Sequence, residues 1–474
     1  MSKKYYITAA IPYVNAKPHI GHALEFVQTN TIARYHKLLG RDVISLSGGD
    51  ENAIKNVQAA ENAHESVQEF VDKNTELFRQ LAIKLNAEFD IWQKGSDRTR
   101  HFPSSQKLWE LCDKNGDIYK KNYEGLYCVG CEQFYTTEEL NENGECFEHP
   151  GKKLEKISEE NYFFRLSKYQ EELIKLINSN KLRIVPENRK KEVLAFLRAG
   201  LEDISISRSN ERAKNWGVPV PDDNTSRLYV WFDALNIYQS GIGFGWDEAK
   251  YKKNWPADLH VIGKGILRFH AVYWPAFLLS AKLSLPKAIF VHDYFTVNGQ
   301  KMSKTLGNVI DPVELINKYE VDPLRYYFLA KFSPFVDGDF SEERFKEVYN
   351  ADLANGLGNL VARVAKLCEN SGLSFPESKT DFFPEVRKYL DKYRFDFALK
   401  FIWEEITKLD QFVNTTKAWE AKGEDQKKIL DELVIGIRQI AFNLKPFLPV
   451  TADKIEKQFA EPKIKSDKPL FPRL

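Results

Sequence analysis

The chain has 474 residues, of which 43% are hydrophobic and 28% charged, so it is long enough for about three globular domains with apolar cores. Its net charge of +1 excludes binding of nucleic acid through a globally basic surface and leaves only local patches for such contacts. The N-terminus lacks the apolar region of a signal peptide, and no later stretch approaches membrane-spanning length. We therefore expect a cytoplasmic protein with no membrane contact.

The first elements form a strand, a turn and a helix. Residues 5–10 are expected to be a short buried strand, and residues 19–39 a helix that ends at Gly40. Free N–H groups at the start of a helix favour an anion, and His19 and His22 add two further donors there. Gly21 leaves room for something flat against the backbone, so adenine and a triphosphate fit this position.

The same two histidines have plainer interpretations. His19 and His22 could be ordinary capping and core residues, or two metal ligands one helical turn apart. No carboxylate follows them at the spacing of a zinc protease, which weakens the metal interpretation. Taken without any other motif, the capping interpretation would be favoured.

Three of the five cysteines form a cluster with a histidine. Cys128 and Cys131 are separated by two residues, as are Cys146 and His149. Two such knuckles predict a structural Zn²⁺ site with four protein ligands and no open position. Buried thiols without metal are the alternative, and the two remaining cysteines are expected to be small core residues.

A lysine-containing loop follows a predicted strand in the second half of the chain. Residues 291–297 are predicted to form a strand, 298–299 a turn, and 301–305 an exposed polar loop. Lys301 and Lys304 could close over phosphates and stabilise a departing pyrophosphate. On its own, the segment could equally be a solvated basic loop, and that interpretation would be favoured.

The last third of the chain is predicted to be helical. From about Val348 the apolar residues recur at helical spacing, for instance Leu433, Ile437, Ala441 and Leu444. Short helices are expected before it, after Asp311-Pro312 and in residues 322–327.

Together, the ordered motifs at 19–22 and 301–305 resemble the signature of class I aminoacyl-tRNA synthetases. Further motifs are similar to those of the methionyl family, namely Ala10-Ile11-Pro12-Tyr13, Tyr229-Val230-Trp231-Phe232-Asp233-Ala234, Ile262-Gly263-Lys264 and Phe269-His270. A single Cys3His knuckle resembles one branch of that family. The length leaves no room for the large editing insertion of the isoleucine, valine and leucine enzymes.

This resemblance implies an α/β fold, with a doubly wound, Rossmann-like parallel-sheet catalytic domain, a zinc-knuckle insertion and an all-α anticodon-binding domain. The expected division is 1–115 and 226–290 for the two halves of the nucleotide-binding fold, and 116–225 for the connective insertion. Residues 291–347 would form a stem-contact segment with the lysine loop, and 348–474 the helical anticodon-binding domain.

The resemblance also implies roles for particular residues. The expected catalytic residues are His19, His22, Lys301 and Lys304, and ATP would further contact Gly21 and Ser303. Asp50 would hold the methionine ammonium group, and Tyr238 is the candidate hydroxyl near sulfur. The other expected methionine-binding residues are Ile11, Tyr13, Trp231, Ala234, Leu235, Ile266 and His270. The aromatic residues could instead be plain core residues, and Asp50 a helix cap.

For the anticodon, the resemblance points to Asn359, Arg363 and Trp419, because polar groups and a stacking aromatic suit unpaired bases. The plainer interpretation makes the first two a solvated helix face and Trp419 a core anchor.

The implied reaction is activation of L-methionine by Mg²⁺-bound ATP and transfer to tRNA(Met), elongator and initiator, by a monomer. The chain departs from the family pattern at Asn52, Ala53, Gly265 and Ala418. A tRNA-binding paralogue that has lost activation is therefore the alternative, with Asn52 and Gly265 as its marks. Another specificity, such as cysteine, is disfavoured because the knuckles lie in an insertion.

Overall fold

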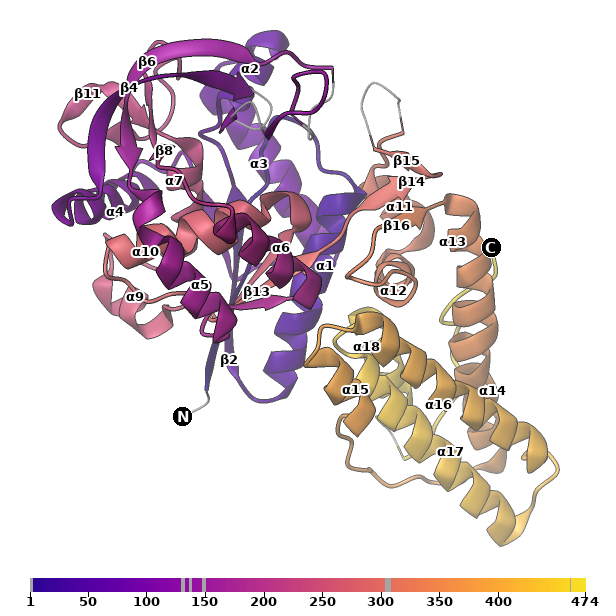
Figure 1. The fold of residues 1–474 in the computed structure, drawn as a ribbon. Coiled ribbons are helices and arrows are strands. Elements are labelled where there is room, and N and C mark those ends of the chain that lie inside the picture. The colour runs from indigo at the N-terminus through magenta and orange to yellow at the C-terminus, as the bar shows by residue number, and fades with distance from the viewer. Residues whose placement is uncertain (1–2, 129–132, 136–138, 147–150, 303–307, 461) are drawn as a thin grey trace. The chain divides into compact units, whose positions relative to one another are not determined.

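The computed structural model describes residues 3–474 except 129–132, 136–138, 147–150, 303–307 and 461. The chain forms two compact units. The first contains residues 1–18, 42–82 and 88–291, and the second contains 19–41, 83–87 and 292–474. Figure 1 labels the elements of both.

The first unit is built on a six-stranded sheet with the order β3-β2-β1-β12-β13-β7. β1 pairs in parallel with both β2 and β12, for instance through Ile7 and Leu259. From β1 the chain proceeds to β2 and β3 on one side and later to β12 and β13 on the other, which is the switch point of a doubly wound sheet. The strand bounds are β1 Lys4–Ala9, β2 Asp42–Gly49, β3 Ile91–Lys94, β7 Arg183–Val185, β12 Leu259–Gly263 and β13 Ala288–His292.

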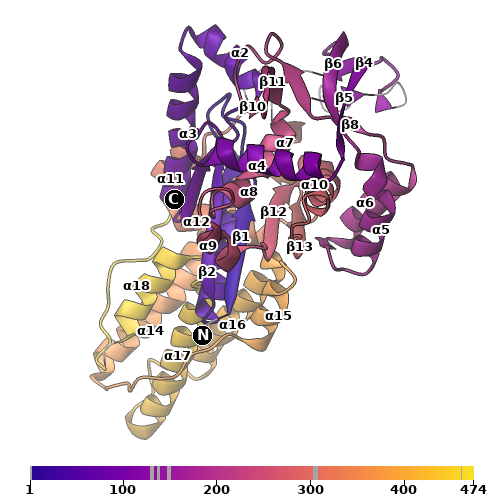
Figure 2. The same ribbon diagram turned by 90° about the vertical axis from the view of Figure 1, so that its left-hand side faces the viewer.

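Helices flank this sheet, and segments between them carry two small antiparallel sheets (Figure 2). The helices of the first unit are α2 Ile54–Ala63, α3 Val67–Lys84, α4 His101–Lys114, α5 Gln170–Asn178, α6 Glu187–Arg198, α7 Val230–Leu235, α8 Ile237–Ser240, α9 Glu248–Asn254 and α10 Trp274–Ser280. One small sheet has the order β5-β4-β6-β8, with β4 Ile118–Cys128, β5 Gln133–Tyr135, β6 Glu155–Phe164 and β8 Ile204–Ser205. The other has the order β10-β11-β9, with β9 Ser207–Ser209, β10 Pro219–Val220 and β11 Asp223–Leu228.

The core of the first unit is rich in large aromatic side chains. Tyr6, Phe232, Trp274 and Phe277 are fully buried in one cluster. Such residues supply the largest apolar area per side chain, so the helices that carry them are fixed tightly against the sheet. The predicted α/β fold with a central parallel sheet is confirmed.

The second unit contains the helix that begins at the histidine motif, α1 Ile20–Leu38. A small sheet with the order β15-β14-β16 is formed by β14 Phe295–Val297, β15 Gln300–Lys301 and β16 Gly338–Phe340. The other helices are α11 Pro312–Tyr319, α12 Val321–Ala330, α13 Glu342–Val348, α14 Asn359–Ser371, α15 Pro384–Leu390, α16 Phe395–Thr415, α17 Gly423–Leu444 and α18 Pro449–Ala460, with a π-helix at Tyr349–Gly358.

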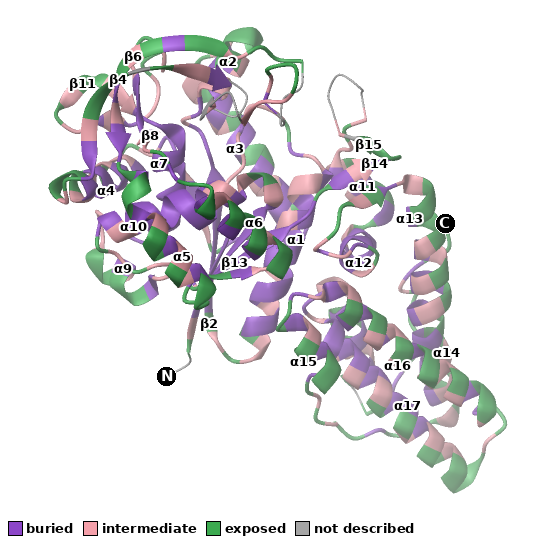
Figure 3. Cartoon of the chain, in the orientation of Figure 1, coloured by how far each residue is buried: buried purple, intermediate pink, exposed green. Residues whose placement is uncertain are grey.

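The predicted helical pattern of the last third is confirmed. Leu433, Ile437, Ala441 and Leu444 are all buried along α17, and α16 and α17 show buried and exposed faces in Figure 3. In the described part of the chain, no helix is long and apolar enough to cross a membrane.

One predicted strand is wrong. Residues 291–297 do not form a single strand, because β13 ends at His292 and β14 begins at Phe295. Between them, the Asp293 N–H donates to the carbonyl of Pro334 and the Tyr294 N–H donates to the Asp337 carboxylate. These bonds redirect the backbone, so the chain leaves one sheet and enters another. The turn at Asn298-Gly299 is confirmed, since both residues have positive φ.

Candidate functional site

His19 and His22 form a capping box at the start of α1. His19 Nδ1 accepts from the Gly21 N–H at 3.1 Å, and His22 Nδ1 accepts from the His19 N–H at 3.2 Å. Because each Nδ1 is an acceptor, each neutral ring carries its proton on Nε2. The plain capping interpretation is thus correct, and in this tautomer each ring has its N–H donor at Nε2, at a helix N-terminus.

Both imidazoles are held in the neutral form. Burial lowers the pKa of His19 to about 4. The pKa of His22 is lowered well below its usual value, by burial first and then by His19. The ring centroids are 3.9 Å apart, so the two rings can act on one ligand. Their contribution to an anion would be hydrogen bonds rather than positive charge.

Gly21 is required by the histidine beside it. A Cβ at Gly21 would lie 2.9 Å from His19 Cε1 and 3.8 Å from the methyl carbon of Met302. The absence of a Cβ at Gly21 therefore leaves space for the His19 ring, and contact of ATP with Gly21 stays a prediction.

The structure brings the histidine motif close to the lysine segment. Met302 approaches Gly21, and the Ile20 N–H donates to the carbonyl of Ile310 at 3.2 Å. Lys301 ends the two-residue strand β15. The Lys301 side chain, Ser303 and Lys304 lie outside the described residues.

Most of the expected methionine-binding residues lie in the apolar core of the first unit, and Tyr13 and His270 contact the Trp231 ring. Trp231 stacks on Phe269 with centroids 3.7 Å apart, and Tyr13 meets its edge at 6.1 Å. Ala234 and Leu235 are buried on the same helix as Trp231, while Ile11 and Ile266 are partly buried against the same core. Burial alone also fits plain core residues, so the substrate role stays a prediction.

Tyr238 and His270 form a hydrogen-bonded pair beside this cluster. The Tyr238 hydroxyl lies 2.7 Å from His270 Nε2, and His270 Nδ1 lies 2.9 Å from the Ile266 carbonyl. Since a carbonyl only accepts, Nδ1 carries the proton and the Tyr238 hydroxyl donates to Nε2. Burial lowers the pKa of His270 to about 4, so this arrangement persists at neutral pH.

Asp50 follows the end of β2 and is 3% exposed. Its N–H donates to the Pro12 carbonyl at 2.9 Å, and its own carbonyl accepts from the Asn56 side chain at 2.8 Å. The next helix, α2, has Ala53 as its N-cap residue. Asp50 is therefore not a helix cap, and its carboxylate lies at the carboxyl edge of the sheet, where doubly wound folds bind ligands.

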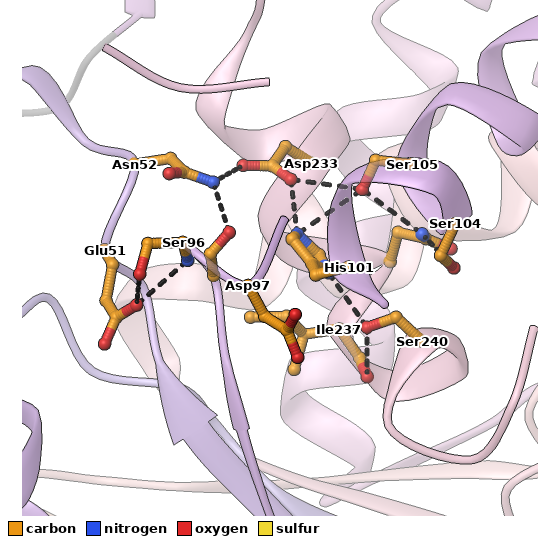
Figure 4. Close-up of polar contacts among 12 residues, drawn as sticks. Glu51, Asn52, Ser96, Asp97, His101, Ser104, Ser105, Asp233, Ile237 and Ser240 are labelled. Atoms are coloured by element: carbon orange, nitrogen blue, oxygen red, sulfur yellow. Dashed lines mark hydrogen bonds and ion pairs between the residues drawn. The ribbon is translucent and has the colours of Figure 1, made fainter. Parts of the chain in front are cut away.

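The residues after Asp50 are fixed from two directions (Figure 4). The Glu51 carboxylate accepts from the Ser96 N–H at 2.9 Å and from the Thr75 hydroxyl at 2.5 Å. Asn52 donates to Asp233 at 2.6 Å. Burial raises the pKa of Glu51, although these donors oppose the rise.

Two of the four expected zinc ligands are described. Cys128 and Cys146 are buried, with their Sγ atoms 3.2 Å apart. This separation is much longer than the roughly 2.05 Å of a disulfide, so the two sulfurs are adjacent but not bonded to each other. Cys131 and His149 lie outside the described residues, and the described residues alone contain no group of three potential ligands.

The anticodon candidates lie in the second unit. Asn359 is exposed at the start of α14, and Arg363 pairs with Asp410 at 2.6 Å and donates to Asn414 at 2.8 Å. Trp419 is 53% exposed, so the interpretation as a core anchor is wrong. Ala418 is buried beside it.

The sequence analysis assigned no role to three residues of the first unit that lie at or near the candidate methionine site. Phe269 was recognised only as part of a motif, yet it covers one face of Trp231. Asp233 also lay in a recognised motif without a role, and His101 had no signal at all. The link between Asp233 and His101 joins residues far apart in the chain, so no local pattern could reveal it.

Comparisons with known proteins agree with this fold and these motifs. The family model described as "tRNA synthetases class I (M)" matches residues 5–365. A methionine–tRNA ligase of Brucella suis biovar 1 (strain 1330) is 39% identical over 97% of this chain and 92% of its own length. One from Thermotoga maritima is 40% identical over 95% of this chain and 74% of its own length.

Among solved structures, Mycobacterium tuberculosis methionyl-tRNA synthetase in complex with methionyl-adenylate has a TM-score of 0.91 and 35% identity, covering 99% of this chain and all of that one. The parallel sheet and the ordered motifs define a class I tRNA synthetase. Within that class, the chain belongs to the methionyl family.

Proposed function

We propose that the chain activates L-methionine with Mg²⁺-bound ATP and transfers the methionyl group to the terminal adenosine of tRNA(Met). A methionine carboxylate oxygen attacks the α-phosphorus, pyrophosphate leaves, and methionyl-adenylate forms. A ribose hydroxyl of the tRNA then attacks the methionyl carbonyl, and AMP leaves. The supporting observation is the pair of neutral imidazoles at the N-terminus of α1, in a chain whose relatives are methionine–tRNA ligases.

The histidine motif would act on the phosphates. His19 and His22 would donate from Nε2 to oxygens of the α-phosphate as negative charge develops there, at the positive end of the α1 dipole. Gly21 would serve ATP indirectly, by leaving space for the His19 ring. Lys301, Ser303 and Lys304 would contact the pyrophosphate, with Mg²⁺ bound by the phosphates.

The methionine side chain would occupy the aromatic cluster. A thioether is apolar and polarisable and packs well against aromatic rings, which the Trp231 and Tyr13 rings offer. Asp50 would hold the ammonium group, and the hydrogen-bonded Tyr238–His270 pair would present a fixed polar surface near sulfur. The remaining members of this proposed set are Ile11, Ala234, Leu235 and Ile266.

The knuckle segment would bind one structural Zn²⁺ through Cys128, Cys131, Cys146 and His149. The close approach of two buried sulfurs supports this set. Metal analysis of the purified protein should give about one zinc per chain, and a Cys146→Ser variant should contain clearly less. Equal zinc in both proteins would contradict the assignment.

Asn359, Arg363 and Trp419 would read the anticodon of elongator and initiator tRNA(Met). The exposed indole of Trp419 supports a stacking role. In this proposal the enzyme works as a monomer in the cytoplasm. Residues 348–474 form the anticodon-binding domain, and residues 291–347 form the stem-contact segment that precedes it in the chain. The catalytic parts would be 1–115 and 226–290, with 116–225 as the insertion.

The test is aminoacylation of purified tRNA(Met) with labelled methionine, compared with a non-cognate tRNA. We expect charging of both elongator and initiator tRNA(Met), and loss of charging in a His22→Ala variant. Binding of tRNA without any charging would identify the chain as an inactive paralogue. Its sequence similarity to methionine–tRNA ligases argues against that alternative.

A further inference from the structure

A buried carboxylate joins the two sides of the candidate methionine site. Asp233 lies on α7, two residues after Trp231, and is 2% exposed. Its Oδ1 accepts from His101 Nε2 and from the Ser105 hydroxyl at 3.1 Å, while its Oδ2 accepts from Asn52 at 2.6 Å. Figure 4 shows these groups converging from three segments of the first unit.

The amide of Asn52 connects Asp233 to the segment that carries Asp50. Asn52 Nδ2 uses both hydrogens, one to Asp233 and one to the Gly95 carbonyl at 2.8 Å. The preceding residue, Glu51, is itself bound by Ser96. The backbone after Asp50 is therefore fixed on both sides, and its position relative to α7 is set through Asn52.

The imidazole of His101 extends the same connection to α8. His101 is fully buried, and its Nδ1 lies 2.8 Å from the Ser240 hydroxyl. Ser240 is the last residue of α8, the helix that carries Tyr238. One continuous chain of hydrogen bonds thus links the Asp50 segment, the helix with Trp231 and the helix with Tyr238.

We propose that Asn52, Asp233 and His101 are positioning residues for methionine, because they set the distance between the Asp50 carboxylate and the aromatic wall formed by Trp231 and Tyr238. This inference rests on the proposed function. That distance measures the separation of the ammonium group from the thioether sulfur, so the network controls affinity and also selectivity for side-chain length. A loosened network loses both, because the two anchors then no longer match one substrate.

The first test is direct binding of methionine by titration calorimetry, without ATP or turnover. Asn52→Ala removes the donor that joins the Asp50 segment to Asp233, at a partly exposed position. We expect its Kd for methionine to rise about tenfold, as for a lost hydrogen bond to a charged group. In S-methylcysteine the sulfur lies one methylene closer to the ammonium group. The ratio of its Kd to that of methionine should be smaller for Asn52→Ala than for the wild type.

His101 gives a second, graded test. Gln can place an amide N–H near the position of imidazole Nε2, whereas Leu cannot donate to Asp233. We expect His101→Gln to bind methionine within about threefold of wild type and His101→Leu to bind at least about tenfold more weakly. If His101→Leu does not fold, Asn52→Ala and His101→Gln still decide the question.

A matched control separates positioning from stability. Ser280 is 1% exposed and donates to the buried Asp117 at 2.7 Å in the same unit, and neither residue belongs to the candidate methionine set. Ser280→Ala should lower the melting temperature as the other variants do and leave the Kd for methionine unchanged. The inference is overturned if the Kd for methionine and the Kd for S-methylcysteine each differ by less than twofold between wild type and Asn52→Ala. Absence of methionine binding by the wild type would instead refute the proposed function.

Discussion

At the scale of single residues, the histidine motif is informative because its hydrogen bonds fix the tautomers. His19 and His22 both accept backbone N–H groups through Nδ1, so each neutral ring carries its proton on Nε2. Their low pKa values mean that the phosphates would meet neutral donors. This arrangement requires no protonation change during the reaction, and it depends on the absence of a side chain at Gly21.

The protonation state of His19 can be measured directly. Its pKa in the folded protein is about 4, below the usual value near 6.5. The unfolded chain therefore binds more protons between these values, so the stabilising contribution of neutral His19 is complete above about pH 6.5 and is lost as the pH falls towards 4. NMR titration of the imidazole nitrogens should find His19 neutral from pH 5 to 8, with His19→Gln to assign the signal. A midpoint near 6.5 would contradict the burial argument.

Substitution of Gly21 tests the motif at its most crowded point. In Gly21→Ala, the new Cβ would lie 2.9 Å from His19 Cε1, so the ring must move. We expect the rate of methionine-dependent pyrophosphate exchange to fall at least about tenfold, within the range for a misplaced catalytic group. The KM for methionine should change little. Gly40→Ala is the control, because Gly40 has φ +74 and no neighbour within 4 Å; it should cost about 1 kcal/mol of stability without this loss of rate.

At the scale of helices and strands, local patterns predicted much of the structure. The start and end of α1, the short helices after Asp311 and in residues 322–327, and the buried stripe of α17 follow from caps and periodicity, which act within a few residues. The break between β13 and β14 could not be predicted, since it depends on hydrogen bonds that residues 293 and 294 donate to Pro334 and Asp337, about 40 residues away. The link between His101 and Asp233 was invisible for the same reason.

The helical region makes a separate prediction about tRNA. Arg363 joins α14 to α16 through Asp410, and the exposed Trp419 lies in the turn that follows α16. Because a stacked base contributes about 1–3 kcal/mol, Trp419→Ala should raise the KM for tRNA(Met) roughly tenfold and leave pyrophosphate exchange unchanged. Ile435→Ala, at a residue exposed to a similar degree on α17, should change neither. Equal effects of the two substitutions on aminoacylation would remove Trp419 from the anticodon site.

At the scale of the whole chain, a buried arginine links several segments of the second unit to one another. Arg325 on α12 is fully buried and donates to the carbonyls of Leu85, Pro446 and Phe447 and to the side chain of Asn30 on α1. Burial lowers its pKa to about 9, so it remains charged at neutral pH. The helix with the histidine motif is thereby linked to the junction of α17 and α18. Sequence motifs gave no sign of this link, which depends on four segments distant in sequence.

Removal of this guanidinium should destabilise the protein strongly. Arg325→Met removes the donor from the carbonyls of Leu85, Pro446 and Phe447, and each buried acceptor left unpaired costs about 1–3 kcal/mol. The Asn30 side chain keeps its bond from Arg34. We expect a loss of about 3 kcal/mol or more in the free energy of unfolding, measured by urea titration. Arg79→Met, at a residue paired with Glu76 on the surface of α3, should stay within about 0.5 kcal/mol of wild type. A similarly small loss in Arg325→Met would show that the buried bonds contribute little.

Activation of methionine is the reaction on which all the proposed residue roles depend. The most direct measurement is methionine-dependent exchange of labelled pyrophosphate into ATP with purified protein, run beside cysteine, isoleucine, leucine, valine and homocysteine. We expect strong exchange with methionine, weaker exchange with homocysteine and almost none with the others. A purified, folded, zinc-loaded protein that exchanges pyrophosphate with none of these amino acids would contradict it.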